Sequence, residues 1–199
     1  VGLCLNARAA EVLQSTSSFT GEIRQLFYGI NDEMFQPVER GVARAEIGLP
    51  EDLAVILYAG RLLEQKGVQD LIEAFVQLRE RRHGRAPVRL MIVGDGPFGD
   101  DLRQQAEATG LSSTDIEFRP AVSIGMMPML MVAADIFVLP SRTEWCEQFG
   151  RVNAEAMLVG TTIVGSTSGE IPRVIGDGGY VFSAGDVESL LRTLEQVLD

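Results

Sequence analysis

From Ala54 to the last residue, short apolar segments alternate with longer segments whose apolar residues recur at helical spacing. Val88–Val93 has the length and composition of a buried strand, whereas the segment 67–82 is amphipathic. The apolar residues of that segment that share one helical face are Leu71, Ile72, Phe75 and Leu78. Alternating strands and helices are typical of a parallel sheet covered on both faces. We therefore expect an α/β fold with a doubly wound parallel sheet in three layers.

Six strands and the helices between them follow from this pattern. The expected strands are 55–59, 88–93, 116–119, 136–139, 162–164 and 179–182. The expected helices are 67–82, 100–109, 127–134, 150–159, 171–175 and 187–198. Met-rich segment 127–134 is interpreted as core and not as a cofactor pocket. Six strands fit the order 3-2-1-4-5-6, in which ligands bind beyond the carboxyl ends of the first and fourth strands.

Charged residues follow those two strands. Arg61 and Lys66 lie just after the first strand, and Glu147 and Glu155 come after the fourth. The topology predicts that all four side chains surround one cleft. Two cations and two acids suit a ligand that carries a diphosphate at one end and hydroxyl groups at the other.

Each of these residues also has a purely structural interpretation. Glu155 falls on the apolar stripe of its helix, where an ionised carboxylate needs a partner. That partner is either a ligand or a core salt bridge to Arg151 or Arg173, and the spacing does not decide between them. Glu147 precedes a helix N-terminus, where any acid is favoured by the helix dipole. Arg61 and Lys66 are alternatively the ordinary charges of a solvated loop.

The segment EQFGRVNAE, from Glu147 to Glu155, resembles the Glu-x7-Glu motif of family-4 glycosyltransferases. The continuation AMLVGTTIVGSTSGEIPRVIGDGG is similar to the usual sequel in that family, and the resemblance covers about residues 55–199. It implies a GT-B fold, in which two Rossmann-like domains face each other and the second binds the nucleotide-sugar donor. The chain is thus identified as resembling that donor-binding domain.

The resemblance also implies roles for individual residues. Arg61, Lys66 and Glu147 would be the catalytic groups, with the two cations on the diphosphate and Glu147 on the hydroxyls of the donor sugar. Glu155 would accept both ribose hydroxyls. The other implied substrate-binding residues are Gly60, Gly94, Pro120, Val122, Phe149 and Gly150.

Among these, the amides around Phe149 and Gly150 would cradle the ligand at a helix N-terminus. Gly94, Pro120 and Val122 would lie near the nucleobase, although Arg119-Pro120 departs from the usual family sequence there. No metal and no cofactor are implied, and the donor would be a UDP-, GDP- or ADP-sugar.

The resemblance implies a truncated protein in which most of the first domain is missing. Residues 1–46 are expected to be a remnant of the first domain, with a short helix near 7–13 and a strand at 22–27, followed by a linker that includes 35–46. Residues 47–199 form the donor-binding domain. The parent enzyme would be a retaining hexosyltransferase whose acceptor binds through the missing domain. This chain alone would therefore transfer sugar poorly or not at all.

Composition excludes several other classes. The 199 residues carry a net charge of −11 without a Lys/Arg run, so nucleic acid is not an expected partner. No apolar stretch approaches the roughly 20 residues that span a bilayer, so any membrane association is expected only through the missing part. Cys4 and Cys146 suggest no disulfide framework, which favours the cytoplasm, including the inner face of its membrane.

Three alternatives remain open. A GT-B sugar-nucleotide epimerase would need a histidine for proton transfer, and His83 is badly placed for that. A dinucleotide-binding module would use Gly94–Gly99, which matches G-x-G-x-x-G after a strand, although a lone match is weak. A non-catalytic nucleotide-binding or interaction module would use Glu155 only for stability.

Overall fold

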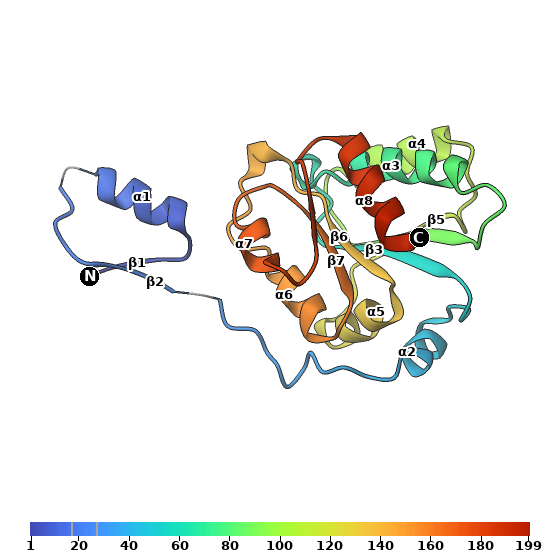
Figure 1. The fold of residues 1–199 in the computed structure, drawn as a ribbon, viewed down its shortest axis with the longest axis horizontal. Coiled ribbons are helices and arrows are strands. Elements are labelled where there is room, and N and C mark those ends of the chain that lie inside the picture. The colour runs from blue at the N-terminus through green and yellow to red at the C-terminus, as the bar shows by residue number, and fades with distance from the viewer. Residues whose placement is uncertain (17, 27) are drawn as a thin grey trace.

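The computed structural model describes residues 1–16, 18–26 and 28–199. Within these residues the larger sheet has six parallel strands in the order β5-β4-β3-β6-β7-β8 (Figure 1). The strands are β3 Ala54–Ala59, β4 Val88–Val93, β5 Ile116–Arg119, β6 Ile136–Leu139, β7 Thr162–Ser166 and β8 Tyr180–Phe182. Counted from β3, this is the order 3-2-1-4-5-6, so the expected doubly wound sheet is confirmed.

Helices cover both faces of this sheet (Figure 1). They are α3 Val68–Arg81, α4 Gly99–Ala108, α5 Met127–Ala133, α6 Arg151–Leu158, α7 Ile171–Ile175 and α8 Val187–Leu198. Helix α3 packs against α4 and α8 on one face, whereas α5, α6 and α7 pack in series on the other. Short 3-10 helices lie in the loops: η1 Glu64–Lys66, η2 Ile124–Met126 and η3 Thr143–Trp145. The expected helices and strands are present, with boundaries that shift by one or two residues.

The central strands are buried on both sides, which explains their unbroken apolar sequences. Ile56 of β3 lies opposite Leu90 on one neighbour and Ile136 on the other. All three side chains are fully buried. The methionine-rich helix α5 contributes Leu130 and Met131 to the same core, as the sequence predicts.

A small unit precedes the larger sheet. Among the described residues it consists of strand β1 Gly2–Cys4, helix α1 Ala7–Ser15 and strand β2 Ile23–Gln25, with β1 and β2 parallel. The side chain of Asn6 caps α1 by accepting from the amide of Ala9 at 2.8 Å. Strand β1 is not predicted from the sequence, β2 is shorter than expected, and Phe27 lies outside the described residues.

The segment 40–47 differs from the sequence analysis, which treats it as linker. Here Arg40–Ile47 forms helix α2, which packs on α5 and is capped by the carboxylate of Glu39. The helix carries three charged residues, and its Ala43 and Ile47, one turn apart, pack on the core. The sequence pattern does not indicate that a charged residue is buried here, yet the side chain of Arg44 is only 2% exposed.

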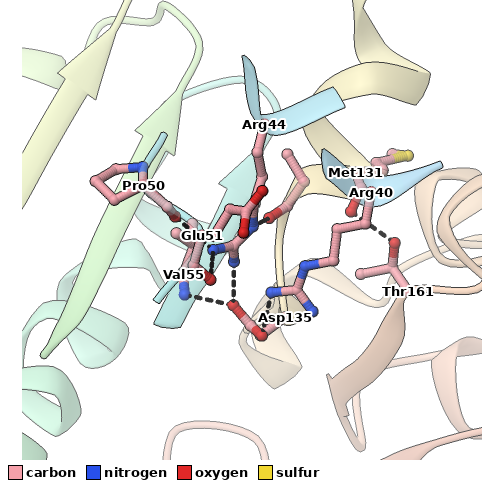
Figure 2. A network of polar contacts seen from close by, with 9 residues as sticks. Arg40, Arg44, Pro50, Glu51, Val55, Met131, Asp135 and Thr161 are labelled. Carbon is pink, nitrogen blue, oxygen red and sulfur yellow. Dashed lines mark hydrogen bonds and ion pairs between the residues drawn. The ribbon is translucent and has the colours of Figure 1, made fainter. Parts of the chain in front are cut away.

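Arg44 anchors α2 to the amino-terminal ends of β3 and β6 (Figure 2). Its guanidinium donates to the carbonyls of Ala133, Pro50 and Glu51 and to Asp135 Oδ2, at 2.7 to 3.0 Å. Asp135 in turn accepts the amide of Val55 at 2.7 Å and pairs with Arg40. This network therefore ties three separate segments together at the end of the sheet opposite to the strands' carboxyl ends.

No helix in the described part of the chain is long and apolar enough to cross a membrane.

The buried arginine generates the first prediction. Arg44→Met removes all the guanidinium donors of this residue at once and leaves Asp135 without its most buried partner. We expect a loss of about 3–5 kcal/mol in the free energy of unfolding, the range for breaking a buried ion pair. Urea denaturation measures it. Arg40→Met is the matched control, because its half-exposed ion pair with the same carboxylate is worth about 1 kcal/mol or less. Equal effects of the two substitutions would contradict this account of α2.

Candidate functional site

A cavity of about 610 Å³ opens at the carboxyl ends of β3 and β6. This volume is within the usual range for small-molecule sites, roughly 300–1,000 Å³. The position is the one that the strand order predicts, because the chain reverses direction between these two strands. The lining residues come from three segments: Tyr28; Tyr58, Ala59, Gly60, Arg61, Leu63 and Lys66; and Leu139, Cys146, Glu147, Gln148, Phe149, Gly150, Arg151 and Val152.

Lys66 and Glu147 meet in this cavity although 81 residues separate them. Lys66 Nζ lies 2.5 Å from Glu147 Oε2, and both side chains are largely shielded, with exposed fractions of 16% and 15%. The predicted convergence of these two residues is therefore observed. The alternative in which Lys66 belongs to an ordinary solvated loop does not fit this geometry.

Gly67 allows the loop that carries Lys66 to approach β6. Its φ is +70°, and a Cβ atom there would lie 2.0 Å from the carbonyl oxygen of Pro140. The amide of Arg142 donates to the carbonyl of Gln65 at 2.9 Å across the same contact. The Arg142 guanidinium also forms a bidentate pair with Asp70, at 2.8 and 2.6 Å, which raises the pKa of Arg142. Backbone and side chains thus hold the two charged loops side by side.

Arg61 lines the same cavity with an exposed side chain that has no ion pair among the described residues. Its backbone is fixed by Tyr58, whose hydroxyl donates to the Arg61 carbonyl at 2.8 Å. Tyr58 is fully buried below the cavity, and burial raises the pKa of its phenol. Sequence reasoning does not single out Tyr58, because it lies within an apolar strand.

The cavity is basic in a chain that is acidic overall. Among its described lining residues, Arg61, Lys66 and Arg151 are cations and Glu147 is the acid, whereas the whole chain has a net charge of −11. Cations on the walls of a cleft attract an anionic ligand. The local charge is therefore suited to a group such as a diphosphate.

Glu155 lies beside the cavity but is not one of its lining residues. Its carboxylate is 6% exposed and pairs with Arg151 Nε at 2.9 Å, whereas Arg151 itself is 57% exposed. Burial raises the pKa of Glu155, and the charge of Arg151 partly opposes the shift. The salt bridge that the sequence offered as an alternative is thus present.

Phe149 and Gly150 lie at the cavity where α6 begins, as predicted. Gly150 is the N-cap of α6 with a φ of +69°, a conformation that favours glycine. The ring of Phe149 contacts Tyr28, with 5.2 Å between the ring centroids. Tyr28, far away in the sequence, is a lining residue that no pattern in the sequence indicates.

The residues expected near a nucleobase fall outside the cavity lining. Gly94 supports the cavity indirectly, because a Cβ atom there would lie 1.9 Å from the carbonyl oxygen of Gly60. Pro120 is exposed and Val122 packs on the core after β5. Asp95, next to Gly94, holds the loop of Pro120 and Val122 by accepting the amide of Ala121 at 2.9 Å.

The glycine-rich loop 94–99 packs closely against neighbouring loops. A Cβ atom at Gly96 would lie 2.2 Å from the carbonyl oxygen of Leu62, so this glycine serves the contact between neighbouring loops. That use differs from a diphosphate cradle, which needs outward-facing amides. His83 is exposed beyond the C-terminal end of α3 and is not part of the cavity. Neither observation favours the dinucleotide or the epimerase alternative.

Cys146 lines the cavity with a φ of +30°, the one positive φ of a non-glycine residue in the described ranges. Across those same ranges, no group of three or more His, Cys, Asp or Glu side chains is arranged to hold a metal ion.

A sequence model of the family "Glycosyl transferases group 1" matches residues 39–199. The chain belongs to this family. The resemblance to glycosyltransferases inferred from Glu147 to Glu155 is therefore confirmed at the level of the family. The matched region begins just before α2, which packs on α5.

The curated relatives have similar sequences over most of the chain. D-inositol 3-phosphate glycosyltransferase of Streptomyces avermitilis is 32% identical over 200 residues, covering 96% of this chain and 42% of the relative. The enzyme of the same name from Mycolicibacterium smegmatis is 31% identical over 179 residues, covering 86% and 38%. The chain thus spans less than half the length of these family members.

Solved structures show the same fold. Sucrose-phosphate synthase from Thermosynechococcus elongatus superposes with a TM-score of 0.82 at 25% identity, covering 98% of this chain and 48% of that one. HepE of Anabaena, solved with UDP and glucose, superposes with a TM-score of 0.83 at 22% identity, covering 99% and 53%. The group 1 family and its GT-B architecture thus agree with the sheet described above.

The buried carboxyl of Glu155 gives a prediction for pH dependence. Because its folded-state pKa is raised above the ordinary 4.5, it favours folding below that pH. This contribution is lost as the pH rises through the folded-state pKa. We therefore expect the stability of wild type relative to Glu155→Gln to fall between pH 4.5 and neutral pH. Urea denaturation of both proteins across that interval measures it.

A stability difference for Glu155→Gln that stays constant or rises with pH would contradict the assigned shift.

Proposed function

We propose that this chain is the donor-binding half of a retaining glycosyltransferase. The parent enzyme moves a hexose from a nucleoside diphosphate to an acceptor hydroxyl and keeps the anomeric configuration. Support for sugar transfer comes from the group 1 family, from relatives named as glycosyltransferases, and from a basic cavity at the switch point of the sheet.

The observation that carries the proposal is the pairing of Lys66 with Glu147 beside Arg61. Loops that follow two different strands supply these side chains to one cavity. Arg61 offers a planar fork of donors and Lys66 a compact charge, and both chemistries suit phosphate oxygens. In the transfer reaction the leaving diphosphate gains negative charge, so the cations stabilise the transition state more than the ground state.

The remaining roles are those that the family resemblance implies. Glu147 accepts hydrogen bonds from hydroxyls of the donor sugar, and the first amides of α6, next to Phe149 and Gly150, face the ligand. Glu155 accepts the ribose hydroxyls once the nucleotide displaces Arg151. Gly60 and Gly94 allow the ligand to approach the backbone, and Pro120 and Val122 lie toward the base.

UDP is the first nucleotide to test, because HepE was solved in complexes with UDP and with UDP-glucose. The step needs no metal in this proposal, since Arg61 and Lys66 supply the positive charge. Acceptor groups lie outside this chain, so the chain by itself binds donor without efficient transfer. We also propose that the enzyme acts in the cytoplasm on nucleotide-sugar donors.

The test is a binding panel. Saturation-transfer NMR of the chain with UDP, GDP, ADP and NAD should show binding of a nucleoside diphosphate. Arg61→Met and Lys66→Met should each weaken that binding about 10- to 100-fold, the value of a charge-assisted hydrogen bond. Arg85→Met is the matched control, because Arg85 pairs with Asp199 far from the cavity and its removal should leave affinity unchanged.

Other results would point to the alternatives. NAD binding without a response to nucleoside diphosphates would favour a dinucleotide-binding module. No binding of any nucleotide would refute the proposal and leave an interaction domain. Rapid sugar transfer by this chain alone would contradict the assignment of the acceptor groups to another part of the protein.

A further inference from the structure

We propose that three buried serines, Ser141, Ser166 and Ser168, position Glu147 for its ligand. We call them the serine network. Ser141 lies two residues after β6, Ser166 at the end of β7 and Ser168 in the loop that follows β7, and all three are fully buried. The inference rests on the proposed function, because it concerns how Glu147 is presented to a donor sugar.

The carboxylate of Glu147 is held from one side. Ser141 Oγ donates to Oε2 at 3.1 Å, and Lys66 Nζ lies 2.5 Å from the same oxygen. Within the described residues Oε1 makes no hydrogen bond. One oxygen is thus fixed by the protein, and the other is left for the cavity that Glu147 lines.

The backbone of Glu147 is held as well. Its amide donates to Ser168 Oγ at 3.3 Å, and its carbonyl accepts the amide of Glu170 at 2.9 Å. Gly169 makes this contact possible, because a Cβ atom there would lie 2.1 Å from the Glu147 carbonyl oxygen. The loop after β7 therefore supports Glu147 from below.

Ser166 and Ser168 are themselves anchored. Ser166 Oγ donates to the Ser141 carbonyl at 2.6 Å and accepts the amide of Ser168 at 3.3 Å. Ser168 Oγ donates to the Arg142 carbonyl at 2.9 Å. Arg142 is also the residue whose amide bonds the loop of Lys66. The network thus fixes Glu147 relative to Lys66.

The contact of Ser141 with Glu147 points to a role beyond stabilising the loops. Buried hydroxyls that bond only backbone groups would stabilise the loops whether or not a ligand binds nearby. Here one hydroxyl ends on a carboxylate that already has a cation, and it selects which oxygen of Glu147 faces the protein. A positioned acceptor loses less entropy when a ligand binds. Ser141 and Ser168 are therefore positioning residues that act through Glu147.

The experiment compares three variants of the whole chain: Ser141→Ala, Ser168→Ala and, as matched control, Thr161→Val. Thr161 is buried and donates to the Met131 carbonyl at 2.6 Å at the other end of the sheet, where Figure 2 shows both residues. All three variants lose a buried hydroxyl and should lose similar stability. Calorimetric affinities for UDP and for UDP-glucose give the first readout, and hydrogen exchange of the Glu147 amide gives the second.

Ser141→Ala should keep its UDP affinity within about twofold but lower the ratio of UDP-glucose to UDP affinity about three- to tenfold. Ser168→Ala should speed exchange of the Glu147 amide about tenfold or more. Thr161→Val should change neither readout. Positioning is overturned if both serine variants behave like Thr161→Val, or if the wild-type chain binds the two probes equally.

The two proposals fail in different ways. A wild-type chain that binds no nucleotide refutes the proposed function. Hydrogen exchange still judges the serine network in that case, because a Glu147 amide that stays protected in Ser168→Ala overturns the positioning role without any ligand.

Discussion

The parallel pairing of β3 with β6 is the constraint on which the site depends. Ile56 and Leu57 lie in register with Ile136 and Phe137, so the two carboxyl ends finish side by side. The loops that follow these two strands therefore lie next to each other, and the Lys66–Glu147 pair forms between them. Removing two charges from water is costly unless they compensate each other. The attraction within the pair therefore offsets part of the cost of placing both groups in a partly shielded cavity, where an anionic ligand can compete for the lysine.

Glycine at a few loop positions makes this closeness possible. Gly67 brings the loop of Lys66 against Pro140, Gly94 brings the loop after β4 against Gly60, and Gly169 brings the loop after β7 against Glu147. In each case a Cβ atom would lie about 2 Å from a carbonyl oxygen, and φ is positive. The cavity is therefore shaped by backbone packed on backbone. Its side chains project from supports that have little freedom to move, which is the condition for a preorganised binding site.

Much of this could be predicted from the sequence because it depends on periodicity. The strand order and the convergence of Arg61, Lys66 and Glu147 follow from apolar spacing and from one rule about switch points. Helix α2 was not predicted, because a charged residue, Arg44, lies in the core and holds it in place beside Ala43 and Ile47. The serine network was missed for a similar reason. Short polar residues at strand ends resemble any turn, and only their partners distinguish them.

The role of Glu155 is the part of the site that the sequence predicts least well. Its motif spacing identified the family, yet its partner in the structure is Arg151, one turn away on the same helix. The central claim concerns Lys66, Arg61 and Glu147, and a crystal structure of the chain soaked with UDP tests it most directly. The account predicts the diphosphate within hydrogen-bonding distance of Arg61 and Lys66, at the carboxyl ends of β3 and β6. A diphosphate bound instead at the loop 94–99, or a cavity that stays empty under saturating UDP, would contradict it.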